Sequence, residues 1–246
     1  MNNNNNQKSL FADTESMAEL IMKNTISPEL WRLLMVFKNT TNEEDKSQAV
    51  IYFTQYGLIM SEKNSPEKLD EILNFTRKFR ELRGSVRQHM ERNIFDVLSR
   101  FIFTSYTILT PLYEPGLIPI DRKKNRDKNE RIDNAFHILV KIVDFIDETI
   151  KYQPSGLDVL DGGRKAMAVK TIETLLDTIK YPKLYDILIR VLLSNYKAAV
   201  LTTLDLIYYN GLKNKKMKKA LRILAVSSKD KSIKDRAEGL LDLFDK

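Results

Sequence analysis

The chain has 246 residues, which is enough for one large domain or two small ones with a sizeable hydrophobic core. Its hydrophobic content of 43% and charged content of 30% are those of a globular protein, and its net charge is +7. The absence of cysteine from the sequence excludes disulfides, thiolate metal sites and cysteine nucleophiles.

The first residues of the chain are rich in asparagine and contain no apolar run of the kind found in a secretory signal. We expect residues 1–10 to be disordered and the protein to be cytoplasmic. The most apolar stretch, residues 94–112, is interrupted by Asp96 and Arg100. It is therefore predicted to be a buried helix and not a membrane span.

Residues 11–110 are predicted to form an N-terminal helical region. The segments 27–29 and 65–67 both read Ser-Pro-Glu. Each combines an N-cap hydroxyl, a proline at the first helical position and an acid in the first turn, which predicts a helix start. The segment 41–44 fits a capping box in which Thr41 is the N-cap.

Residues 111–131 are predicted to connect two helical regions. Prolines at positions 111, 115 and 119 prevent a continuous helix, and a run of charged residues follows at 121–131. We expect this connecting loop to be partly packed and partly solvated, and a C-terminal helical region to occupy residues 132–246.

The first helix of that C-terminal region has apolar residues at alternating steps of four and three, namely Ile132, Phe136, Leu139, Val143, Ile146 and Ile150. This a/d pattern predicts packing against other helices of the chain, and it is also compatible with a dimer through the helix 132–150. Five shorter helices are predicted to follow, at residues 162–180, 182–194, 196–209, 214–226 and 232–245.

No residue pattern typical of a catalytic, nucleotide or metal site is visible in the sequence. His89 and His137 have no second ligand at the spacing of a metal site, so both are predicted to be exposed or ion-paired. Asp144, Asp147 and Glu148 lie on one predicted helix without the histidine partners of a di-iron site. They predict a solvated acidic face, and we expect no enzyme activity, cofactor or metal.

Positive charge is concentrated in residues 213–236, where ten Lys and Arg residues stand against two aspartates. Met217, Leu221 and Leu224 are expected to face the core and the basic residues to be exposed. Several cations within one Debye length can bind phosphates or an acidic protein, although a merely solvated surface is the alternative. The candidate binding residues are Lys213, Lys215, Lys216, Lys218, Lys219, Arg222, Lys229, Lys231, Lys234 and Arg236.

Three C-terminal segments share a loose repeat and align on Ala168, Ala199 and Ala237. A repeated helical unit of this size is typical of a helical solenoid. The segment 229–237, KDKSIKDRA, resembles the start of the second helix in HEAT or armadillo repeats, where an Asp-x-x-(Val/Ile)-(Arg/Lys) phrase precedes an alanine. The resemblance covers about residues 160–246 and implies stacked helix pairs with an extended binding surface.

The helical patterning and this resemblance predict an all-α fold. We expect a right-handed stack of ten to eleven helices, arranged as a HEAT-like α-solenoid or as an irregular helical bundle. Such a chain is predicted to be a non-enzymatic scaffold or adaptor for another protein, one with an acidic surface.

The alternative function is binding of nucleic acid or an anionic surface through residues 213–236. The absence of aromatic residues from that segment argues against base stacking. A remote alternative is a HEAT-like DNA glycosylase, a resemblance that implies aromatic side chains and an aspartate in a positively charged groove. The one tryptophan, Trp31, lies on an amphipathic helix and is predicted to belong to the core.

Overall fold

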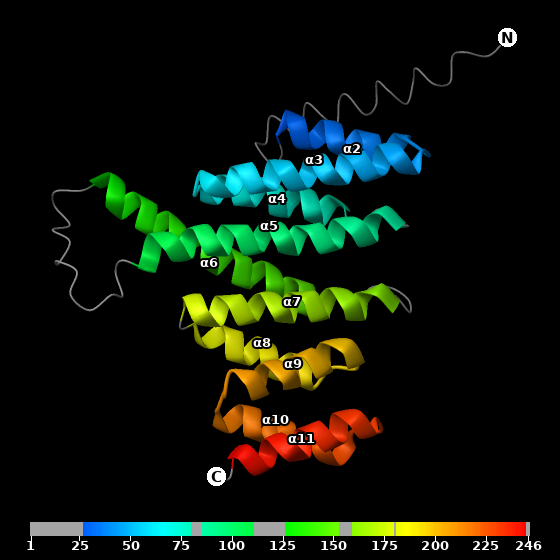
Figure 1. Cartoon of the computed structure of the whole chain (residues 1–246), viewed down its shortest axis with the longest axis vertical. Coiled ribbons are helices and arrows are strands. Elements are labelled where there is room, and N and C mark those ends of the chain that lie inside the picture. Colours follow the sequence, from blue (N-terminus) through cyan, green and yellow to red (C-terminus); the bar gives the residue numbers. More distant parts are fainter. Residues whose placement is uncertain (1–26, 80–84, 111–125, 153–158, 180, 245–246) are drawn as a thin grey trace. The chain divides into compact units, whose positions relative to one another are not determined.

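The computed structural model describes residues 27–79, 85–110, 126–152, 159–179 and 181–244. Over these ranges the chain is all-helical, with ten helices and no strand, as predicted (Figure 1). The asparagine-rich residues 1–10 and residues 111–125 of the predicted connecting loop lie outside the described residues. The chain divides into two compact units, residues 1–100 and 101–246.

Unit 1 contains α2 (Pro28–Asn39), α3 (Glu43–Glu62), α4 (Pro66–Phe79) and the first part of α5 (Ser85–Leu109). Both predicted Ser-Pro helix starts are confirmed, and the Ser27 hydroxyl accepts a hydrogen bond from the Leu30 amide at 3.3 Å. The predicted cap of α3 is wrong by one residue. Asn42 is the N-cap in place of Thr41, because its side-chain oxygen accepts a hydrogen bond from the Glu44 amide at 3.0 Å.

The core of unit 1 is built from aromatic and aliphatic side chains. Phe53 of α3 and Phe75 of α4 are fully buried and stack with ring centroids 5.0 Å apart. Trp31 of α2 is 4% exposed and belongs to this core, as predicted. Gly57 lies inside α3, where an added Cβ would come within 2.6 Å of both γ carbons of Val97 on α5. The glycine therefore lets these two helices approach closely.

Unit 2 contains the end of α5 followed by α6 (Arg126–Lys151), α7 (Val159–Thr178), α8 (Pro182–Leu192), α9 (Lys197–Tyr209), α10 (Lys215–Ser227) and α11 (Lys231–Phe244). The five helices from α7 to α11 lie within a few residues of their predicted bounds. The connecting loop was predicted to extend to residue 131, but α6 already begins at Arg126. The charged segment 126–131 contains no proline or glycine, and its arginines, lysine and glutamate are good helix formers.

The helices of unit 2 form two layers. In one layer α7 contacts α9 and α9 contacts α11, and in the other α6 contacts α8 and α8 contacts α10. Helices of the two layers also contact each other, as α6 does with α7, α8 with α9 and α10 with α11, so that the two layers are joined (Figure 1). Each successive helix pair therefore stacks on the pair before it.

The three aligned alanines of the sequence repeat lie in the layer formed by α7, α9 and α11. Ala168, Ala199 and Ala237 are completely buried. Small side chains at these positions allow neighbouring helices to approach one another, whereas larger ones would hold them apart. All three alanines thus have a packing role inside unit 2.

The predicted a/d seam of α6 is largely buried inside unit 2. Leu139, Val143, Ile146 and Ile150 are at most 6% exposed, and α6 contacts both α7 and α8. Phe136, which the pattern assigns to the same seam, is 39% exposed. Intramolecular packing therefore occupies most of the seam, and a dimer through this helix stays a prediction.

The acidic face predicted on α6 is solvated only in part, because Asp144 is exposed and Glu148 half-buried, whereas Asp147 is buried. Asp147 is 5% exposed and accepts hydrogen bonds from Lys151 at 2.7 Å and from Arg190 of α8. Nearby, Lys183 of α8 donates to Asp144 at 2.7 Å. Burial alone would raise the pKa of Asp147, but the hydrogen bonds from Lys151 and Arg190 outweigh burial and hold the pKa below its ordinary value. This carboxylate connects α6 to α8.

A buried lysine joins α6, α7 and the start of α9. Lys165 of α7 is 2% exposed and donates hydrogen bonds to the carbonyl oxygens of Ile150, at 2.8 Å, and Tyr152, at 2.7 Å. Its ammonium nitrogen also lies 4.0 Å from the ring centroid of Tyr196. The lysine thereby satisfies carbonyl groups that the end of a helix leaves without intrahelical partners.

Candidate partner-binding surface

The predicted binding segment 213–236 folds into the last helix pair of unit 2. Asn214 caps α10 by accepting a hydrogen bond from the Lys216 amide at 2.8 Å. The apolar residues predicted to face the core are buried, with Met217 and Leu221 at 0% exposure and Leu224 at 8%. Because these side chains face inward, the basic residues between them are placed on the outside of the pair.

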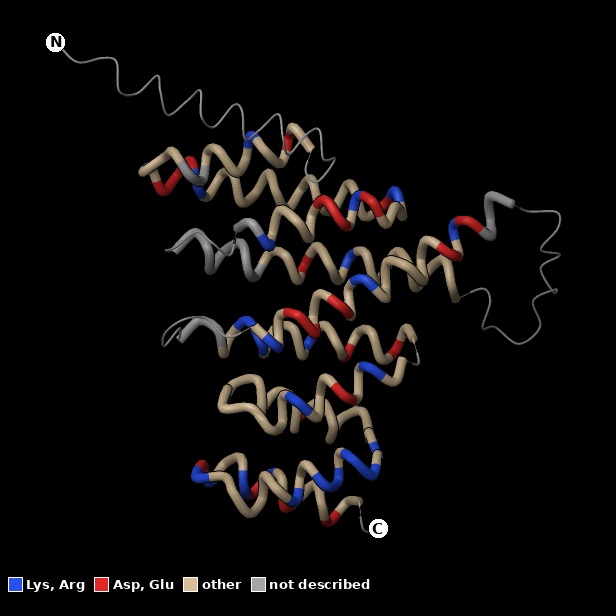
Figure 2. The backbone as a smooth tube through the Cα atoms, turned by 180° about the vertical axis from the view of Figure 1, so that it is seen from behind, with Lys and Arg blue, Asp and Glu red and all other residues tan. Residues whose placement is uncertain are grey.

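Nearly all of the ten candidate cations are exposed, as predicted. Lys218 is the exception, since it is half-buried. Figure 2 shows Lys and Arg gathered on the last two helices of unit 2, with few acidic residues between them. The exposed members are Lys213, Lys215, Lys216, Lys219, Arg222, Lys229, Lys231, Lys234 and Arg236.

Acidic side chains neutralise only part of this surface. Lys216 lies 3.5 Å from Asp186 of α8, and Arg236 pairs with Asp205 of α9. Lys234 lies 3.9 Å from Glu238, one turn further along α11. Ion pairs as exposed as these are worth little and leave the cations accessible to solvent.

The first turns of α10 carry lysines where helix stability favours acids. The backbone dipole places partial positive charge at a helix N-terminus, so a cation there is unfavourable by about 0.3–1 kcal/mol. The first turn of α10 contains no acidic residue, and Lys215 and Lys216 occupy its start. Helix stability therefore does not account for these lysines.

The exposed face of α10 changes character along its length. Lys215, Lys219 and Arg222 follow each other at steps of four and three, so they lie on one side of the helix. Val226 continues the same line and is 87% exposed, and Ile223 beside it is 44% exposed. The face is thus cationic at its start and apolar at its end.

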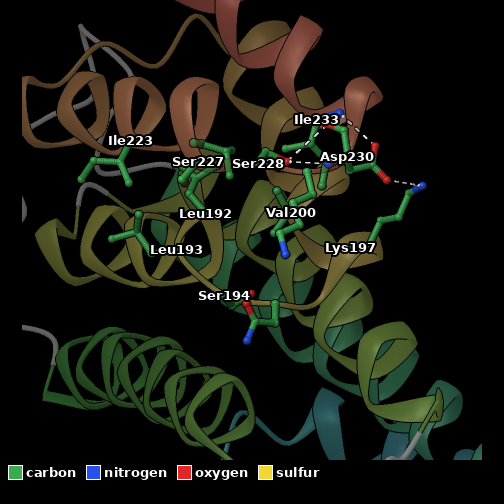
Figure 3. Close-up of a pocket in the computed structure, with 13 residues that line it drawn as sticks. Leu192, Leu193, Ser194, Lys197, Val200, Ile223, Ser227, Ser228, Asp230 and Ile233 are labelled. Carbon is green, nitrogen blue, oxygen red and sulfur yellow. Dashed lines mark hydrogen bonds and ion pairs between the residues drawn. The ribbon is translucent and has the colours of Figure 1, made fainter.

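A pocket of about 520 Å³ opens where this apolar end meets the neighbouring helices (Figure 3). It lies among the end of α8, the start of α9, the end of α10 and the start of α11. Its lining residues are Leu192, Leu193, Ser194, Asn195, Lys197, Val200, Ile223, Leu224, Ser227, Ser228, Lys229, Asp230 and Ile233.

The two sides of the pocket differ in chemistry. Leu193 and Ile223 lie on one side, and the ion pair of Lys197 with Asp230 lies on the other, with 2.6 Å between its charged atoms (Figure 3). The Asp230 carboxylate also accepts hydrogen bonds from the Ser232 and Ile233 amides, at 3.0 and 3.3 Å, and so caps α11. The hydrogen bond from Lys197 is the main reason why the pKa of Asp230 is lowered.

Two exposed tyrosines precede the basic segment. Tyr208 and Tyr209 at the end of α9 are 58% and 78% exposed, and their rings meet edge to face with centroids 5.3 Å apart. They come shortly before Lys213 in the sequence. They lie outside the segment 213–236, which the concentration of positive charge singles out in the sequence.

The structure also places the other candidate residues. The His137 side chain is exposed, that of His89 lies outside the described side chains, and Trp31 is buried and so is not available to a surface groove. In the described part of the chain, no group of three or more His, Asp or Glu side chains is arranged to hold a metal ion. Within the same residues, no helix has the length and apolar character needed to cross a membrane.

Neither the pocket nor its apolar rim is predicted from the sequence. The available signal was the position of Ile223 and Val226, which fall off the buried line of Met217, Leu221 and Leu224 on the same helix. Leu193 gave no such signal, because it lies just after the end of α8 and its exposure depends on tertiary packing.

No protein-family model, curated protein or solved structure matches this chain.

Proposed function

We propose that the protein is a non-enzymatic adaptor that binds an acidic surface of another protein through its last helix pair. The observation that supports this most is the line of exposed cations on α10, formed by Lys215, Lys219 and Arg222. Within the described part of the chain, no acidic side chain lies within ion-pair distance of these three. An acidic partner would supply the missing counter-charges.

The kind of cation favours a broad acidic surface over a single phosphate group. Lysine is a flexible point charge, whereas arginine offers the planar, bidentate geometry that suits individual phosphates. Eight of the ten cationic side chains in residues 213–236 are lysines. Their fields add over about 10 Å at moderate salt, so the surface attracts an acidic protein before contact.

The two-layer packing of unit 2 supports a HEAT-like arrangement, which we include in the proposal. In such an arrangement every helix pair contributes one side to a continuous surface, and the surface can be wider than the basic segment itself. We place the adaptor in the cytoplasm, a proposal that rests on the composition of the sequence.

The experiment is a capture of binding proteins from a native lysate on the immobilised full chain. The proposal expects recovered proteins with acidic surfaces that elute as salt is raised, because charge pairs between exposed groups are screened. A chain with K215E, K219E and R222E should recover much less of the same proteins. Equal recovery on both chains would overturn the proposal.

The exposed Tyr208–Tyr209 pair favours nucleic acid as a second candidate partner. Stacking of a base on an aromatic ring is worth about 1–3 kcal/mol, and lysines near it can contact the phosphate backbone. Titration of labelled single-stranded DNA and RNA at low and physiological salt tests this candidate. Binding that weakens log-linearly with salt and is lost in Y208A/Y209A would support it. The absence of binding at low salt would exclude it.

A further inference from the structure

We infer that the pocket at the end of α10 receives one bulky apolar side chain from an acidic segment of the partner protein. The inference rests on the proposed function and adds to it. The cations of α10 bind the acidic residues of that segment, and the pocket anchors an aliphatic or aromatic residue next to them.

Apolar side chains at and beside the pocket are exposed to solvent. Leu193 is 52% exposed, Ile223 is 44% exposed and Val226, next to the lining residue Ser227, is 87% exposed. Leu193, which follows α8, and Ile223 of α10 both line the pocket, so two separate segments contribute to its apolar side. A partner side chain placed between Leu193 and Ile223 would remove apolar surface of both from water.

The cations of α10 adjoin the apolar side of the pocket, because Lys219 lies one helical turn before the lining residue Ile223. Lys215, Lys219 and Arg222 occupy the side of α10 that continues into Val226. A partner segment lying along α10 would therefore meet positive charge first and apolar surface second. The corresponding ligand carries a run of Asp or Glu with a large apolar residue at one end.

The polar side of the pocket also has an excess of positive charge. Lys197 and Lys229 both line it and are exposed, whereas Asp230 is its one acidic lining residue. The Asp230 carboxylate is already engaged by the α11 amides and by Lys197. Lys229 is thus placed to bind a carboxylate of the partner next to the anchored side chain.

Charge makes a second copy of this chain a poor occupant. A symmetric contact through this surface would bring two copies of Lys219 and Arg222 close to each other, and like charges at short range repel. An acidic segment of another protein has the complementary charge. The apolar rim likewise gives no advantage to a nucleic acid, whose backbone is charged throughout.

The test begins with selection of a phage-displayed library of random peptides on the full-length protein. Enriched peptides are then measured by fluorescence anisotropy against the wild type and against L193S/I223S, which makes the pocket rim polar. The control is I51S/I59S, because Ile51 and Ile59 of unit 1 have similar exposure, 47% and 57%. Melting temperatures confirm that both variants are folded.

The inference expects peptides that combine Asp or Glu with one large apolar residue. They should bind L193S/I223S roughly tenfold more weakly, the effect of losing most of a buried apolar contact, and should bind I51S/I59S unchanged. Acidic peptides that need no apolar residue and bind L193S/I223S as tightly as the wild type would overturn the inference. If the same peptides no longer bind K215E/K219E/R222E, the proposed function would still be supported.

Two further outcomes also count against the inference. Peptides that are not acidic, and that bind K215E/K219E/R222E as well as the wild type, would contradict both the pocket and the proposed function. Sedimentation that shows a wild-type dimer dispersed by L193S/I223S would identify a second copy of the chain as the occupant, and so would overturn the inference of an acidic partner.

Discussion

Two buried charged side chains, Lys165 and Asp147, fix contacts between helices of unit 2. Lys165 bonds the carbonyl groups of Ile150 and Tyr152, and Asp147 bonds Arg190 across to α8. Neither role is predicted from the sequence. Helical spacing shows which residues share a face, but it does not show which charged residue forms hydrogen bonds in the core. This explains why Asp147 was predicted to be solvated.

Replacing Lys165 by methionine should destabilise the protein. The variant keeps a long apolar stem but leaves the carbonyls of Ile150 and Tyr152 without this donor, at a cost of about 2 kcal/mol. Urea unfolding should show a lower midpoint for K165M. The control K170M changes an exposed lysine of the same helix and should stay within about 0.5 kcal/mol of the wild type. Equal midpoints for K165M and K170M would contradict the structural role.

The contribution of Asp147 to stability should depend on pH. Its pKa in the folded protein is below the ordinary value of 3.8, so the carboxylate stabilises the fold above that pH and loses this effect as the pH falls through the folded pKa. At pH 7, D147N should be less stable by about 1–2 kcal/mol.

The difference in unfolding free energy between wild type and D147N should be smaller near pH 3 than at pH 7. Below the ordinary pKa of 3.8, the Asp147 carboxyl binds a proton more readily in the unfolded protein than in the folded one. Other acidic residues titrate in both proteins, so their contributions cancel when the two unfolding free energies are subtracted. A gap of the same size at both pH values would show that Asp147 stabilises the fold without its charge.

At the scale of single helices, the contact of α3 with α5 depends on one glycine. Alanine is a better helix former than glycine by about 1 kcal/mol, so G57A would stabilise an isolated α3. In the structure the added Cβ would lie 2.6 Å from both γ carbons of Val97, whose branched side chain has little freedom to move away. Packing therefore opposes helix propensity at this position.

We expect packing to dominate and G57A to destabilise the protein by about 1–3 kcal/mol. The double variant G57A/V97A removes the γ carbons and should recover part of the loss, as a double-mutant cycle in thermal or urea unfolding would show. If G57A alone is as stable as the wild type, the two helices do not approach as closely as described.

Helix bounds were the part of the fold most accessible to sequence reasoning. Proline starts, buried periodicity and the three aligned alanines predicted α7 to α11 closely, because each is a local signal. The start of α6 was wrong because a run of charged residues can be either a loop or an exposed helix end, and local composition does not decide between them. The exposure of Phe136 depends on where two other helices pack against α6, and a heptad pattern holds no information about the positions of those helices.

For the whole molecule, the sequence predicted the cationic surface but not the pocket beside it. Charge on a helix can be read from spacing, since Met217, Leu221 and Leu224 define the buried side of α10. The pocket combines residues from α8, α9, α10 and α11, including Leu193 and Asp230. Its existence depends on how these helices stack, which is a tertiary property.

Binding of an acidic partner by the cations of α10 is measured as the affinity of purified protein for the captured partner. The variant K215E/K219E/R222E is compared with the control R32E/K63E/K170E. The control changes the net charge by the same amount at exposed positions outside α10. We expect loss of binding in the first variant only. Its melting temperature should be unchanged or raised, because acidic side chains stabilise the N-terminus of α10. Equal affinities for the two variants would contradict this role of the α10 cations.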